Sequence, residues 1–123
     1  MMLLDADVMV DVARNYPPAI VWLMGLGSVG LPGLVAMELL QGCRNLTVQR
    51  RLEKQLQRYP SYWPTLADCQ RGYQDFAAYR LSYGLGLIDA LIGATAVGYG
   101  EPLATFNVKH YAVIAGLTTV QPY

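Results

Sequence analysis

The sequence predicts an α/β fold: a single domain with a central, mostly parallel, twisted sheet of four to five short strands flanked by helices. Two observations carry this prediction. Short apolar runs of strand length alternate with longer segments of helical periodicity, as in parallel α/β domains. In addition, 54% of the 123 residues are apolar and only 15% are charged, which is enough apolar material for one buried core. We therefore expect one domain spanning residues 1–123.

The first half of the chain is expected to hold two strands. Met1–Leu4 is an apolar run typical of a buried parallel strand, and Val29–Leu31 is the second candidate. A helix should follow Asp7 and stop at Tyr16-Pro17-Pro18, because proline cannot continue a helix interior. Two further helices are expected over residues 19–24 and 34–43.

The second half is expected to be mainly helical. Thr47 is a plausible N-cap for a helix that runs to about Tyr59, where Pro60 follows. Gly84 and Gly86 should end a helix that precedes them. The remaining expected elements are helices over 67–83 and 87–98 and strands over 102–105 and 118–120.

Three acids interrupt apolar segments that are far apart in the sequence. Asp5 closes the first apolar run, Glu38 lies within an apolar helix, and Asp89 is the only charge in residues 86–98. A buried carboxylate is costly unless a cation or hydrogen-bond donors compensate it. Reactive groups of parallel sheets collect beyond the carboxyl ends of the strands, where Asp7 and Asn107 would also lie. An oxygen-rich site of this kind favours Mg²⁺, with Mn²⁺ as a substitute.

Each of these residues also has a purely structural explanation. Asp5 and Asp89 suit helix N-caps, and Glu38 suits the first turn of a helix, where the dipole favours an acid. Asp7 and Asn107 are explained nearly as well by capping or Asx-turns. The occurrence of three such acids together favours the metal-site interpretation.

Four sequence blocks resemble the signature blocks of PIN-domain ribonucleases, most closely the VapC-type toxins of type II toxin–antitoxin systems. The blocks occur in the family's order and cover nearly the whole chain: Leu3–Asp11, Val35–Gly42, Leu87–Ala96 and Ala104–Tyr111. The resemblance implies that Asp5, Glu38 and Asp89 are catalytic, metal-binding acids. Asn107 departs from the pattern, since many members carry an acid there, and Asp7 stands where similar toxins commonly carry asparagine.

The resemblance implies a Mg²⁺-dependent endoribonuclease that hydrolyses phosphodiester bonds in RNA by metal-activated water. It also implies a cognate antitoxin as partner, an RNA substrate, a homodimer and a cytoplasmic location. The longest uncharged stretch is too interrupted to cross a membrane. The alternative is a PIN-like module that binds RNA or protein without cleaving. A phospho-acceptor signalling domain is a second alternative, but Asp68 and Asp75 fall in expected helix rather than at a strand end.

Charge alone does not indicate a nucleic-acid partner. Nine Lys and Arg residues balance nine Asp and Glu residues, so the net charge is zero. Five of the nine positive charges lie between Arg44 and Arg58. This cluster is either a solvated helix face or a surface for RNA phosphate or an acidic partner segment.

Overall fold

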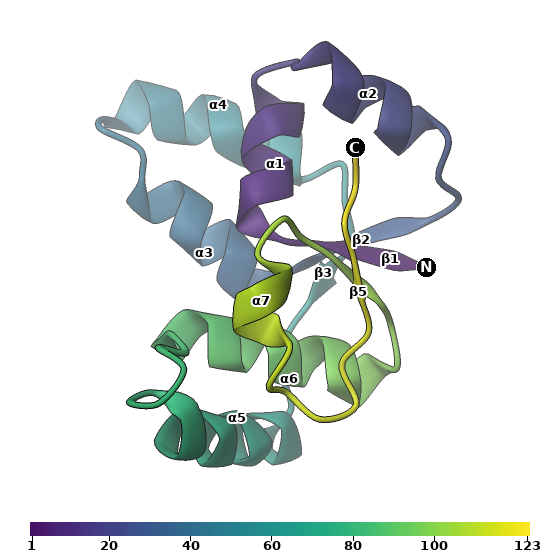
Figure 1. Ribbon diagram of the computed structural model, residues 1–123. Helices are drawn as coiled ribbons and strands as arrows, with labels where there is room; N and C mark the ends of the chain where they lie inside the picture. Colours follow the sequence, from purple (N-terminus) through teal and green to yellow (C-terminus); the bar gives the residue numbers. More distant parts are fainter.

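Five parallel strands form one sheet in the order β3-β2-β1-β4-β5. The computed structural model describes residues 1–123, and Figure 1 shows how its elements are arranged. The predicted α/β class with a parallel sheet is confirmed. The strands are β1 (Met2–Leu4), β2 (Val29–Pro32), β3 (Ser61–Tyr62), β4 (Leu103–Ala104) and β5 (Thr119–Val120).

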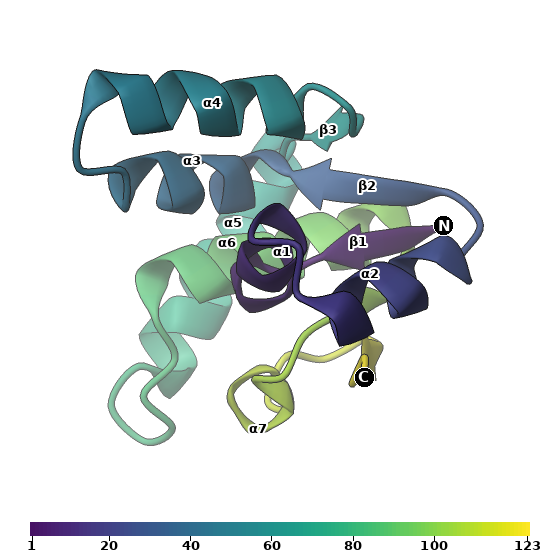
Figure 2. The ribbon, with the colours of Figure 1, turned by 90° about the horizontal axis from the view of Figure 1, so that it is seen from above.

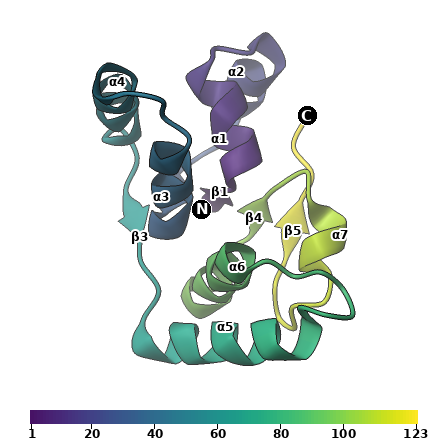
Figure 3. The same cartoon turned by 90° about the vertical axis from the view of Figure 1, so that its left-hand side faces the viewer.

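Helices cover both faces of the sheet. Figure 3 shows α1, α2 and α4 on one side of the strands and α5 and α6 on the other, with α3 packed against α1, α4 and α6. The helices are α1 (Ala6–Ala13), α2 (Pro17–Met24), α3 (Gly33–Gln41), α4 (Leu46–Leu56), α5 (Leu66–Tyr79), α6 (Leu87–Tyr99) and α7 (Val108–Tyr111). None of them has the length and apolar character needed to cross a membrane.

The central strand β1 lies in the middle of the core. Leu3 and Leu4 are fully buried, because both faces of a parallel sheet are covered by helices. Helix α6 packs closely over this layer, and Ala90, Ala94 and Ala96 are buried on it. Small residues allow the helix axis to approach its neighbours.

Several predicted boundaries were wrong. The N-cap of α4 is Asn45 rather than Thr47, and its side chain accepts a hydrogen bond from the backbone N–H of Val48 at 2.9 Å. Helix α5 begins at Leu66 and ends at Tyr79, four residues before the predicted end. Strand β3 and helix α7 were not predicted at all, because each is shorter than the windows in which periodicity can be detected.

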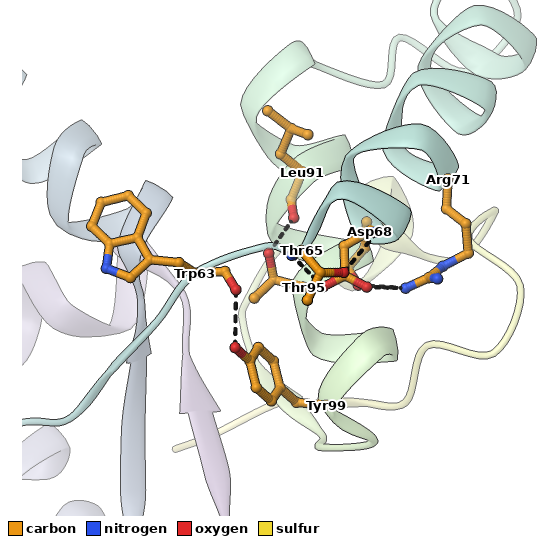
Figure 4. Close-up of polar contacts among 8 residues, drawn as sticks. Trp63, Thr65, Asp68, Arg71, Leu91, Thr95 and Tyr99 are labelled. Carbon is orange, nitrogen blue, oxygen red and sulfur yellow. Dashed lines mark hydrogen bonds and ion pairs between the residues drawn. The ribbon is translucent and has the colours of Figure 1, made fainter.

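A buried acid fixes helix α5 against α6 (Figure 4). Asp68 is 3% exposed and closes a capping box, in which its Oδ2 accepts a 2.9 Å hydrogen bond from the N–H of Thr65. Its other oxygen pairs with Arg71, which also donates to the carbonyl of Ala94 in α6. A Cβ at Gly98 would overlap the Asp68 carboxylate, so the two helices meet there without room for a side chain. This contact fixes the position of α6, the helix that carries Asp89.

The topology brings distant segments to one edge of the sheet. Figure 2 shows β1 and β2 pointing toward the side where α1 and α3 begin. Strand β4 is in register with β1, with Leu4 opposite Ala104, so Asp5 and Thr105 leave the sheet side by side. The backbone N–H of Asp5 donates to the carbonyl of Ala104 at 3.0 Å.

Candidate metal centre

Asp5 is the most buried of the predicted site acids, with 5% of its surface exposed. Its Oδ1 accepts a 2.8 Å hydrogen bond from the N–H of Ala6, which is the predicted N-cap contact. Its Oδ2 accepts a 2.7 Å hydrogen bond from the hydroxyl of Thr105. Burial raises the pKa of Asp5, while the bonds from Thr105 and Ala6 oppose that rise. The N-cap contact therefore accounts for one oxygen of Asp5, and the Thr105 hydroxyl binds the other.

Asp7 lies in the first turn of α1, next to Asp5. Its Oδ2 accepts a 3.0 Å hydrogen bond from the backbone N–H of Phe106. Its Oδ1 is buried and has no hydrogen-bond partner. Burial raises the pKa of Asp7, and the charge of Asp5 raises it further. The contact with Phe106 ties α1 to the loop that follows β4.

Asp89 occupies the first turn of α6, beside a tyrosine that the sequence analysis did not single out. The hydroxyl of Tyr111 lies 3.2 Å from Asp89 Oδ1 and donates to it. Tyr111 is 1% exposed and comes from α7. Burial raises the pKa of Asp89, whereas the bond from Tyr111 and the charge of His110 lower it. Burial and the charges of Asp5 and Asp89 raise the pKa of the Tyr111 hydroxyl far above its usual value, so it remains a proton donor.

Glu38 reaches the same group from the middle of α3. Its Oε1 is buried without a hydrogen-bond partner. Burial raises the pKa of Glu38 most, followed by the charges of Asp89, Asp5 and Asp7. The structure thus brings together four acids that α1, α3 and α6 carry. The charge of at least one of the others raises the pKa of each of them.

Asn107 lies beside this group but makes different contacts. It is half-buried at the N-cap of α7, where its side chain makes no capping hydrogen bond. Its backbone N–H donates to the Thr105 hydroxyl oxygen at 3.0 Å. The hydrogen bonds of the four acids do not involve its side chain. Its amide adds no charge to the group.

A cleft of about 470 Å³ opens beside Glu38. Most of its lining is apolar and comes from α1, α3 and α4, including Val10, Leu39 and Leu52. The side chains of Arg14 and Arg51 also line it. The acid group is therefore continuous with a surface groove that bears two cations.

The chemistry of the acid group fits a hard divalent cation. All its available ligand atoms are oxygens, and Asp7 Oδ1 and Glu38 Oε1 are buried atoms that lack any protein partner. As they stand, no three His, Cys, Asp or Glu side chains are arranged closely enough to hold one ion between them. Like charges repel, and the bonds from Thr105, Phe106 and Tyr111 each orient one carboxylate. Mg²⁺ or Mn²⁺ would supply the positive charge that this group lacks.

Known proteins share this fold. A family model described as PIN domain matches residues 2–115. The fold is similar to that of a toxin–antitoxin complex from Klebsiella pneumoniae, with 26% sequence identity, coverage of 100% of this chain and 98% of that chain, and a TM-score of 0.76. It is also similar to DNA-bound VapBC from Salmonella typhimurium, with 21% identity, 97% and 96% coverage and a TM-score of 0.79. FitAcB from Neisseria gonorrhoeae shares 22% identity, with 98% and 97% coverage and a TM-score of 0.74. A search of curated proteins gave no match.

Proposed function

Because the chain belongs to the PIN domain family, we propose that it is a Mg²⁺-dependent endoribonuclease and the toxin of a toxin–antitoxin pair. The observation that carries the proposal is the gathering of Asp5, Asp7, Glu38 and Asp89 at the carboxyl edge of the sheet, with raised pKa values. Perturbed acids beside a cleft are typical of catalytic sites.

In this proposal Asp5, Glu38 and Asp89 hold Mg²⁺, with smaller contributions from Asp7 and Asn107. Mn²⁺ would substitute, because it prefers the same oxygen ligands. A bound ion supplies positive charge to the phosphodiester and makes water a better nucleophile at neutral pH. The protein's own part is to bring these acids together and to orient them. The hydroxyl of Thr105 donates to Asp5 Oδ2, and the hydroxyl of Tyr111 donates to Asp89 Oδ1.

The proposed partners follow from the same family. The Klebsiella relative is a toxin–antitoxin complex, and we extend that assembly to this chain. A cognate antitoxin segment would occupy the cleft beside Glu38 and keep the enzyme inactive. We also propose a homodimer, since large apolar side chains such as Leu66, Leu81 and Tyr73 are exposed. The domain would span residues 1–123 and act in the cytoplasm.

The test is cleavage of single-stranded RNA by the purified protein. We expect cleavage with Mg²⁺ or Mn²⁺ and none with a chelator. Asp5→Asn and Glu38→Gln should abolish cleavage while retaining the far-UV circular dichroism of the wild type. Asp75→Asn, which changes an acid on α5 outside the group, is the matched control and should cleave normally. RNA binding without cleavage at any metal concentration would favour the non-cleaving module instead.

A further inference from the structure

A row of aromatic side chains leads away from the acid group along α1. We define the aromatic row as Phe106, Tyr123 and Tyr16. The rings of Phe106 and Tyr123 are 5.0 Å apart at 74°, and those of Tyr123 and Tyr16 are 6.1 Å apart at 54°. The ring of Trp22 also contacts Tyr123, with the ring centres 5.8 Å apart. Figure 1 shows the chain's last segment passing beside α1 and α2.

One face of α1 anchors this row at three points. Asp7, Asp11 and Arg14 share that face, because they are four and three residues apart. Asp7 accepts from the N–H of Phe106 at 3.0 Å, and Asp11 accepts from the Tyr123 hydroxyl at 2.6 Å. The Arg14 guanidinium lies 5.1 Å from the centre of the Tyr16 ring. At about 1.5 Å per residue, the row extends roughly 10 Å from the acids.

Both ends of the row remain open to solvent. Phe106 is 38% exposed and Tyr16 is 40% exposed, and a phenylalanine ring has no polar group that would favour exposure. Arg14 forms a 2.9 Å ion pair with Asp11 through one nitrogen, but its side chain is 62% exposed. The guanidinium has five N–H donors, so several remain free for a phosphate.

We propose that the aromatic row is a stacking surface for single-stranded RNA. A base of the substrate stacks on Phe106, a neighbouring base stacks on Tyr16, and Arg14 contacts a backbone phosphate between or beyond them. Exposed aromatic rings together with a cation are the general means by which proteins bind unpaired nucleotides without reading their sequence. The direct bond between the Phe106 backbone and Asp7 places a stacked base next to the acids. This inference rests on the proposed ribonuclease function and names the segment that binds RNA beside the cleavage site.

The test is steady-state cleavage of a short single-stranded RNA by the full chain with Mg²⁺. We expect Phe106→Ala and Tyr16→Ala each to raise KM about tenfold and to change kcat little, since a lost stacking contact weakens binding by that order. Phe106→Leu preserves apolar packing against Tyr123 and should show the same loss, whereas Phe106→Trp should retain wild-type KM. Tyr83→Ala, which changes an exposed tyrosine in the loop after α5, is the control and should have no effect.

A series of RNAs with one abasic ribose at successive positions separates stacking from indirect effects. When the abasic ribose takes the place of the base that stacks on Phe106, the KM of the wild type should rise by the same factor as the Phe106→Ala substitution causes. The KM of Phe106→Ala should not rise further on that RNA. Equal KM for the wild type, Phe106→Ala and Phe106→Leu would overturn the aromatic row as an RNA surface. The proposal would also be overturned if Phe106→Ala had a higher KM than the wild type on every abasic RNA. A substitution that weakens only antitoxin binding would overturn it too. If the wild type neither cleaves nor binds RNA, the proposed function itself fails.

Discussion

The hydroxyl of Thr105 donates a 2.7 Å hydrogen bond to Asp5 Oδ2. Its oxygen also accepts a 3.0 Å hydrogen bond from the N–H of Asn107. The hydroxyl has one proton, and Asp5 Oδ2 at 2.7 Å is a nearer acceptor than Asp7 Oδ2 at 3.5 Å, so the proton is directed to Asp5. Two adjacent strands thereby fix one carboxylate at the edge of the sheet.

Removing that hydroxyl should destabilise the fold. Thr105→Val leaves a buried Asp5 oxygen without its donor, and we expect the free energy of unfolding at pH 7 to fall by about 1–3 kcal/mol. Thr105→Ser keeps the hydroxyl donor, so its free energy of unfolding should fall by less. Urea unfolding of both variants measures the difference. Equal stabilities for the valine and serine variants would show that the bond does not matter.

Tyr111 is expected to orient Asp89 for metal binding. Tyr111→Phe removes only the hydroxyl, and its ring should still fill the core because Tyr111 is 1% exposed. Metal affinity should fall about tenfold or more, which is the usual effect of losing a group that orients a ligand. Calorimetric titration with Mn²⁺ measures it. Tyr99→Phe is the control, because that hydroxyl bonds to the carbonyl of Trp63, away from the acids.

The acid group should make the metal-free protein less stable as pH rises. The folded state raises the pKa of Glu38 above its ordinary value of 4.5, so the folded state holds protons that the unfolded state has released. The free energy of unfolding therefore decreases as pH rises from that value through the folded-state pKa. In a chelator, Glu38→Gln should remove part of this decrease and should unfold at higher temperature than the wild type at pH 7.

With Mg²⁺ present, the wild type should unfold at a higher temperature than Glu38→Gln. Binding to the folded state alone adds stability by mass action, and the wild type should gain more than Glu38→Gln. Thermal unfolding at pH 7 with and without Mg²⁺ compares the two. A wild type that is insensitive to the ion and to pH in this range would contradict the electrostatic account of the group.

The contact between α5 and α6 should not tolerate a methyl group. Alanine ordinarily stabilises a helix by about 1 kcal/mol relative to glycine. At Gly98 the added Cβ would overlap the Asp68 carboxylate, so we expect Gly98→Ala to destabilise the protein by about 1–3 kcal/mol. Gly27→Ala is the control, because nothing lies within 4 Å of a Cβ built there. Chemical denaturation of both variants gives the comparison.

Much of the fold was predictable because its signals are local. The apolar run of β1 and the long segment of α6 with its single charge identify both elements from the sequence alone. The two-residue strand β3 could not be predicted, because its conformation depends on pairing with β2, where Ser61 lies opposite Leu31. Helix α7 has four residues and no usable periodicity.

The candidate site was predictable to a different degree. Asp5, Glu38 and Asp89 could be chosen because a charge in an apolar segment stands out, and the structure places all three near one another. Thr105 lies in the fourth sequence block, two residues before Asn107, and its hydroxyl donates to Asp5. Tyr111 was missed, since its contact with Asp89 exists only once α7 folds over the start of α6. Its place at the end of the fourth sequence block was the one available signal.

The central claim is that the acids at the edge of the sheet bind a divalent cation. Anomalous diffraction from crystals soaked in Mn²⁺ tests it most directly. We predict a manganese peak in contact with oxygens of Asp5 and Asp89, with Glu38 turned toward it. Peaks found only elsewhere on the surface, with these carboxylates positioned as they are without the ion, would contradict the account.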